Sequence, residues 1–160
     1  MRRNEQTSPL TGIGGWLLLF ILTRTVIGPP WNAFRTHQRW DGLEAQVGTY
    51  AQSAEFAQLQ ESAWTLYAAG TAIGIATGVL MVLKRRPSSV WTAICGLWIA
   101  GLVLPIVGYA YGLHVTGEQM NLNDLSFMLV QMLSVSLWTA YLFMSKRVKN
   151  TYGFRQRGAL

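Results

Sequence analysis

Four long uncharged stretches alternate with short charged segments along the 160-residue chain. The stretches contain no Asp, Glu, Lys or Arg, and they run from Gln6 to Thr23, Ser62 to Leu83, Pro87 to Gly117 and Leu125 to Ser145. A transmembrane helix needs about 20 predominantly apolar residues, so each stretch suffices for one. The pattern therefore predicts an all-α polytopic membrane protein, a single domain over residues 1–160. Its four transmembrane helices are expected at about residues 12–28, 64–83, 90–111 and 125–144.

Prolines set the expected ends and bends of these helices. Pro29 and Pro30 follow the first apolar stretch. Proline lacks an amide proton and biases the preceding residue away from helix, so we expect the first helix to end at Gly28. Pro105 lies inside the third stretch and predicts a kink near Gly101.

Residues 29–62 form the longest segment between two predicted spans. Leu43, Val47, Tyr50 and Ala54 recur there at intervals of three and four, which predicts an external amphipathic helix before the second transmembrane helix. We expect this helix to lie on the outer membrane surface or against the protein. A docking surface outside the membrane is the alternative.

Charge fixes the expected orientation in the membrane. Charged residues make up 12% of the chain, against about 25% in soluble domains. Most of the basic residues lie at the two ends of the chain and between the second and third stretches; these are Arg2, Arg3, Lys84, Arg85, Arg86, Lys146, Arg147, Lys149, Arg155 and Arg157. The opposite side carries only Arg35 and Arg39. The positive-inside rule then predicts that the N-terminus, the C-terminus and the middle loop are cytoplasmic, and the net charge of +6 indicates topology, not a nucleic-acid partner.

Small and polar residues inside the predicted spans are candidate packing or binding positions. Gly70, Gly74 and Gly78 form a ridge on the second helix, and such ridges let helices approach closely in lipid. The sequence leaves open whether this ridge packs within the monomer or between chains.

Arg24 and Gln131 are the distinctly polar residues at membrane depth. Arg24 can snorkel to the headgroups, pair with Glu61 or Asp124, or hold a ligand anion. Gln131 can donate a hydrogen bond to another helix, or it can line a polar path together with Arg24, Ser134 and Tyr109.

Reactive chemistry is sparse in this sequence. Cys95 is the single cysteine, and His37 and His114 both fall in predicted external loops, so we expect no haem held by paired histidines and no multi-cysteine metal site. No phosphate-binding loop or nucleophile motif occurs. We therefore expect a protein that is not an enzyme and that needs no cofactor or metal.

Two stretches at the ends of the apolar region resemble a known family. They are Gly12–Phe20 (GIGGWLLLF) and Tyr141–Tyr152 (YLFMSKRVKNTY), together about 21 residues. The chain resembles a family of bacterial inner-membrane proteins known as domain of unknown function family 2569. This resemblance implies the bacterial cytoplasmic (inner) membrane and a four-helix fold, and it supplies no catalytic residues. Within the second stretch, Lys146, Arg147 and Lys149 form a basic collar that can bind lipid headgroups or dock a partner.

Three functions are compatible with these features. The first is a non-catalytic accessory or scaffold subunit of a larger membrane complex, respiratory or photosynthetic in kind. The second is a small oligomeric transporter or channel. The third is a lipid- or quinone-binding module that uses Trp98 and Trp138. The expected partners are membrane lipids, together with other membrane subunits or further copies of this chain.

Overall fold

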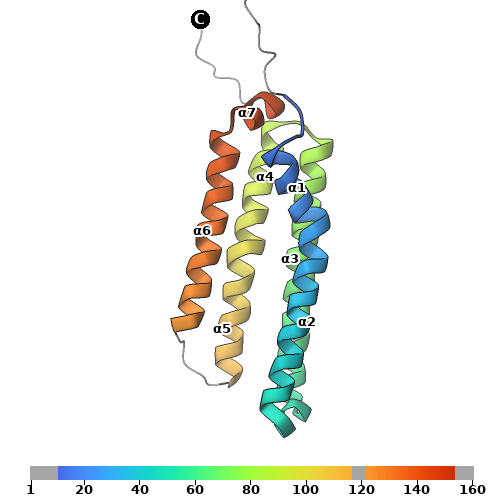
Figure 1. Cartoon of the computed structure of the whole chain (residues 1–160), viewed down its shortest axis with the longest axis vertical. Helices are drawn as coiled ribbons and strands as arrows, with labels where there is room; N and C mark the ends of the chain where they lie inside the picture. Colours follow the sequence, from blue (N-terminus) through green and yellow to red (C-terminus); the bar gives the residue numbers. More distant parts are fainter. Residues whose placement is uncertain (1–10, 117–121, 154–160) are drawn as a thin grey trace, which may run out of the picture.

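The fold consists of long helices that run side by side (Figure 1). The computed structural model describes residues 11–116 and 122–153. In order, the elements are α1 (Trp16–Leu22), η1 (Thr23–Ile27), α2 (Gly28–Val47), η2 (Gly48–Gln52), α3 (Ala54–Leu83), α4 (Pro87–Trp98), η3 (Ile99–Val103), α5 (Leu104–Thr116), α6 (Leu122–Met144) and α7 (Lys146–Tyr152). Within the described part of the chain, four helical runs are long and apolar enough to cross a membrane: Trp16–Gln52, Ala54–Leu83, Pro87–Val115 and Leu125–Met144. The predicted all-α fold with four transmembrane helices is confirmed, and the chain is a membrane protein.

The first long helix does not end at the two prolines, so the prediction that it stops at Gly28 is wrong. A π-helical turn, η1, precedes the prolines, and the amide of Gly28 donates to the carbonyl of Thr23 five residues earlier. This wider turn shifts the hydrogen-bond register, so that α2 begins anew with its prolines in the first turn. The first amide groups of a helix have no intrahelical acceptor. Pro29 and Pro30, which lack an amide proton, therefore cost α2 no hydrogen bond.

A π-helical turn also precedes the proline of the third long helix. The π-helical turn η3 precedes Leu104 and Pro105, and the amide of Leu104 donates to the carbonyl of Ile99. The predicted kink near Gly101 therefore corresponds to a widened turn at that residue. The helix continues on both sides of it, from Pro87 to Thr116.

The amphipathic stripe of residues 43–54 is helical, but it is divided among three elements. Leu43 and Val47 belong to α2, Tyr50 to the 3₁₀ turn η2, and α3 begins directly after Ser53. The Ser53 hydroxyl caps α3 by accepting a hydrogen bond from the amide of Phe56, at 3.2 Å. Segment 29–62 thus contains one arm of a hairpin and the start of the other. Its position outside the membrane stays a prediction.

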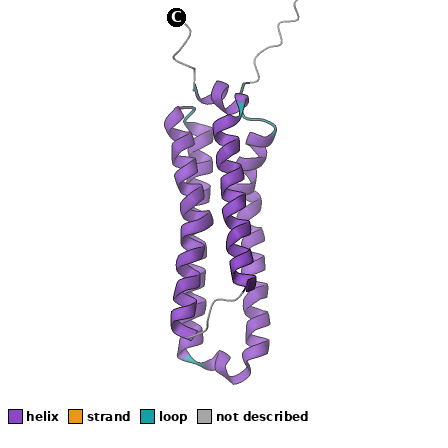
Figure 2. Cartoon of the chain, turned by 90° about the vertical axis from the view of Figure 1, so that its left-hand side faces the viewer, coloured by secondary structure: helices purple, strands orange, loops and turns teal. Residues whose placement is uncertain are grey.

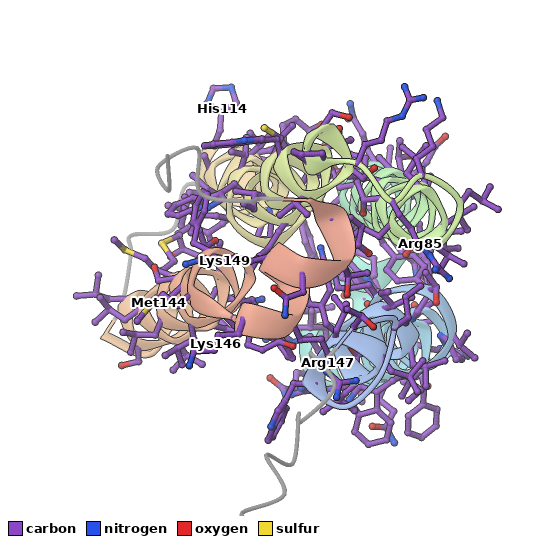
Figure 3. The ribbon with its side chains drawn as sticks, turned by 90° about the horizontal axis from the view of Figure 1, so that it is seen from above. Arg85, His114, Met144, Lys146, Arg147 and Lys149 are labelled. Carbon is purple, nitrogen blue, oxygen red and sulfur yellow. The ribbon has the colours of Figure 1, made fainter. Side chains whose placement is uncertain are left out.

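The hydrophobic core lies at one end of the bundle, where α7 folds back across the other helices (Figures 2 and 3). We call this the capped end, and we call the opposite end, at η2, the open end. The buried core residues are Leu17, Phe20, Ile21, Met81, Val90, Ala93, Ile94, Leu97, Val135, Leu142, Val148 and Tyr152. They come from α1, α3, α4, α6 and α7, so that nearly every helix contributes to this end. Gly12 and Thr151, near the two ends of the described chain, are hydrogen-bonded to each other at the capped end. The cytoplasmic location of this end stays a prediction.

The two stretches that resemble the family meet at the capped end. The amide of Gly12 donates to the Thr151 hydroxyl at 3.0 Å, and that hydroxyl donates to the Gly12 carbonyl at 3.3 Å. The Tyr152 hydroxyl, fully buried, donates to the carbonyl of Met81 at 2.8 Å. Residues 139 positions apart in the chain therefore close the bundle together.

Candidate functional site

A cavity of about 970 Å³ lies between α2, α3, α5 and α6, toward the open end. Its lining combines polar side chains of α2 with small and apolar side chains of α3 and α5. A hydrogen bond joins α3 to α2 at the cavity, because the Tyr67 hydroxyl donates to the carbonyl of Pro29 at 2.6 Å. A cavity of this volume that combines apolar walls with a few polar side chains is typical of a ligand site, and it is therefore the candidate site.

One face of α2 with η1 supplies the charges of the cavity. Arg24, Asn32, Arg35, Arg39 and Gln46 all line it. They share a face because the helix runs without a break through the prolines and these residues follow one another at multiples of a helical turn. At 1.5 Å per residue, the Cα atoms of Arg24 and Arg35 are about 16 Å apart along the axis.

Arg24 lies deep in the bundle. It follows Trp16, the first residue of α1, by about 12 Å along the helix, and the hydrocarbon core of a bilayer is about 30 Å thick. The prediction that Arg24 snorkels to the outer headgroups depends on a helix that ends one turn after Arg24. The helix instead continues to Val47. Arg24 lines the cavity at a point about 12 Å along the helix from the start of the first candidate span.

The cavity is rich in positive charge. Three arginines line it, and the described lining residues include neither Asp nor Glu. Among the described residues, no carboxylate lies within ion-pair distance of Arg24, Arg35 or Arg39; the pair that is present, His37 with Asp41 at 3.0 Å, lies on the exposed surface of α2. Of the two carboxylates predicted to pair with Arg24, Glu61 does not do so, and the side chain of Asp124 lies outside the described part.

Residues of the other helices complete the walls. Gln131 of α6 and Tyr109 of α5 line the cavity together with Arg24, whereas Ser134 is not among the lining residues. The Arg39 guanidinium carbon lies 5.4 Å from the ring centroid of Phe127, so this cation–π contact joins α2 to α6. Trp98 and Trp138 pack against the core at the capped half and do not line the cavity.

The glycine ridge of α3 packs inside the chain. A Cβ atom on Gly70 would lie 3.5 Å from Leu104, and one on Gly74 would lie 3.3 Å from the carbonyl oxygen of Arg24. A Cβ atom on Gly78 would overlap the side chain of Thr25. The missing side chains thus allow the π-helical turn η1 to approach α3 closely.

The basic collar lies away from the cavity. Lys146 and Lys149 are exposed on α7, and Arg147 reaches toward Gly14 near the start of the first helix (Figure 3). These side chains surround the capped end, where a lipid headgroup or a partner remains the predicted contact. Among the described residues, no group of three or more His, Cys, Asp or Glu side chains is placed to hold a metal ion.

The sequence identified Arg24 and Gln131 as intramembrane polar residues but did not place Arg35 and Arg39 with them. A signal was present, because positions 24, 28, 32, 35 and 39 follow at intervals of four, four, three and four. The assumed helix end at the prolines concealed this common face.

The chain belongs to the family described as Protein of unknown function (DUF2569), whose family model matches residues 10–153. This match confirms the resemblance that the two end stretches indicate. No curated protein and no solved structure matches the chain.

Proposed function

We propose that this member of the DUF2569 family binds an anionic ligand within the membrane, in the cavity that Arg24, Arg35 and Arg39 line. One observation carries the proposal: three guanidinium groups line a single cavity, and among the described residues that line it there is no carboxylate.

The physical argument starts from the energy of a charged side chain in the membrane. An arginine near the centre of a transmembrane helix costs about 2.5 to 3.5 kcal/mol on insertion scales. Such residues usually pair with another group or mark a functional site. The planar guanidinium binds phosphate and carboxylate groups through two parallel hydrogen bonds, so an anion supplies the partner that Arg24 lacks among the described side chains.

The other functions predicted from the sequence have less support. Transport fits the lining by Gln131 and Tyr109, but a path across the membrane also requires the core at the capped end to open. The subunit role was motivated partly by the glycine ridge, which packs within the chain. Ligand binding requires neither an opening nor a partner.

Titration calorimetry on delipidated protein in an uncharged detergent tests the proposal. Two anionic probes, dioctanoyl phosphatidylglycerol and inorganic phosphate, are compared with neutral dioctanoyl phosphatidylcholine. We expect at least one anionic probe to saturate at one molecule per chain, and we expect no saturable binding of the neutral lipid. The Arg24→Gln substitution should weaken binding roughly 10- to 100-fold, since it removes a charge-assisted hydrogen bond.

Arg86→Gln is the matched control. It removes the same charge from an exposed residue at the capped end, outside the cavity. Equal affinities of the Arg24→Gln and Arg86→Gln proteins would contradict the proposal, as would the failure of both anionic probes to bind.

A further inference from the structure

The cavity is bounded on one side by two helices that barely contact each other. Helix α6 has its most extensive backbone contacts with α4, η3 and α7. Among the described residues, its backbone contacts with α2 and α5 are fewer. Yet Phe127, Met128 and Gln131 of α6 line the same cavity as the arginines of α2. In its open half, α6 therefore forms a wall of the cavity with little close backbone contact to α2.

A cation–π contact between described residues spans the space between α2 and α6, which we call the α2–α6 gap. Arg39 lies over the ring of Phe127 at 5.4 Å. Such a contact in an exposed position contributes only about 0.5 to 1 kcal/mol. It can open without disturbing the core, which lies toward the other end.

Exposed apolar side chains lie on the two helices that flank the α2–α6 gap. On α2, Trp31 and Phe34 are exposed by 59% and 55%; on α6, Val130 is exposed by 64%. Inside the cavity, the arginine face of α2 is opposed by apolar side chains such as Leu66, Leu104 and Met128. The cavity thus combines a charged wall with an apolar one, which matches an amphiphile with an anionic headgroup.

The aqueous approach from the open end carries the opposite charge. Asp41 and Glu44 of α2, and Glu55 and Glu61 of α3, are all exposed there. These carboxylates repel a free anion that approaches from water, whereas a lipid anion that moves within the bilayer avoids them.

We infer that the ligand is an anionic membrane lipid that enters sideways through the α2–α6 gap, with the Arg39–Phe127 contact as its gate. This inference rests on the proposed function, because it names the source and the route of the anion that the cavity binds. The headgroup phosphate contacts the arginine face, and the acyl chains extend past Phe127 into the bilayer.

A reversible bridge across the gap tests the route. In a Cys95→Ser background, Arg39→Cys and Phe127→Cys are joined by a bifunctional thiosulfonate reagent that a reductant cleaves. The full chain is delipidated, bridged or left reduced, and reconstituted into nanodiscs of phosphatidylcholine with about 10% phosphatidylglycerol. Native mass spectrometry then counts the lipids that each chain retains. Both arms lack Arg39, so the comparison isolates the bridge, and formation of the bridge checks that the two positions face each other.

We expect the reduced protein to retain phosphatidylglycerol selectively and the bridged protein to retain at least fivefold less. Binding of inorganic phosphate, measured by calorimetry in detergent, should be equal in the two arms. Phe127→Ala, in the otherwise natural chain, should raise the rate of phosphatidylglycerol exchange roughly two- to fivefold, because it removes the weak contact of the gate.

Three results would overturn the inference, and they differ in what else they affect. Equal retention of phosphatidylglycerol by bridged and reduced protein would exclude the lateral route and leave the proposed function intact. Binding of inorganic phosphate without retention of phosphatidylglycerol would exclude the lipid source, again with the proposed function intact. If neither anion binds the reduced protein or the natural chain, the proposed function fails together with the inference.

Discussion

The capped half and the open half of this bundle are made from the same four long helices, yet the capped half is closely packed and the open half contains a cavity. At the capped end, apolar side chains of five helices interdigitate, and hydrogen bonds fasten α7 and the residues before α1 to the bundle. At the open end, the helices surround a cavity lined by three arginines. Burial of apolar surface stabilises little in lipid, so close packing and hydrogen bonds hold membrane helices together. We therefore expect most of the stability to reside in the capped half, while the open half holds arginines that have no carboxylate partner among the described residues.

The largest expected effect comes from truncating a core side chain at the capped end. Tyr152→Ala removes a fully buried ring and its bond to the Met81 carbonyl, so we expect a loss of about 3 to 5 kcal/mol in the free energy of unfolding. Phe127→Ala, an equally large truncation in the open half, should cost under about 1 kcal/mol. Thermal unfolding in detergent, followed by tryptophan fluorescence, measures both. Similar losses would remove the distinction between the halves.

Overfilling the glycine ridge should have the next largest effect. Gly78→Leu forces α3 away from Thr25, and overpacking of this kind costs about 1 to 3 kcal/mol. Gly112→Ala is the control, because no atom lies within 4 Å of a Cβ placed there. It should be neutral or stabilise the helix by up to about 1 kcal/mol. Thermal unfolding in detergent measures both proteins. An unchanged stability of the Gly78→Leu protein would show that the ridge is not closely packed.

A smaller change isolates the hydroxyl of Tyr152. Tyr152→Phe keeps the ring but leaves the Met81 carbonyl without its donor, and we expect a loss of about 1 to 2 kcal/mol near neutral pH.

The same substitution should alter the dependence on pH. Burial raises the pKa of Tyr152 from 10.0 to about 12, while the nearby Arg85 lowers it in part. Between these values the unfolded chain has released a proton that the folded chain still holds, so the free energy of unfolding falls as the pH rises from 10.0 to about 12. This fall should be shallower in the Tyr152→Phe protein. Parallel curves for the two proteins would mean that the hydroxyl is not buried.

The smallest effect on stability is expected where the effect on binding is largest. Arg24→Leu removes an intramembrane charge that has no carboxylate partner among the described residues, so the ligand-free protein should unfold at an equal or slightly higher temperature. The gain should be about 1 kcal/mol or less. The stabilisation of the natural chain by an anionic probe should disappear. A strongly destabilised Arg24→Leu protein would indicate that Arg24 is structural and that the open half also supports the fold.

Much of the fold follows from the sequence, because gaps between charges mark the spans directly. The helix ends do not follow, since the sequence does not reveal that a π-helical turn precedes Pro29. Arg24 and Gln131 stand out as polar residues in apolar surroundings. Their grouping with Arg35 and Arg39 depends on the unbroken helix and could not be recognised without it.

The sequence predicts only part of the structure at the capped end. Lys146 and Lys149 were recognised as a basic collar, whereas Val148 and Tyr152 between and beyond them are buried. Val148 and Tyr152 are four residues apart, and they follow Ser145, whose hydroxyl caps α7; this is the pattern of a short helix with one apolar face. Charge dominated the interpretation of this stretch and concealed its apolar side.

The π-helical turn before the prolines has a consequence for how the length of this chain can vary. An α-helical turn closes over four residues and a π-helical turn closes over five, so the turn at Thr23–Ile27 holds one residue more than a regular helix needs. Deleting a single residue there would let the turn close as ordinary α-helix and would keep Arg35 and Arg39 on the cavity face. A single deletion between Asn32 and Arg35 has no such extra residue to absorb it and would turn Arg35 and Arg39 by about 100° relative to Arg24. Natural variation should therefore tolerate single-residue deletions in the π-helical turn and avoid them further along α2.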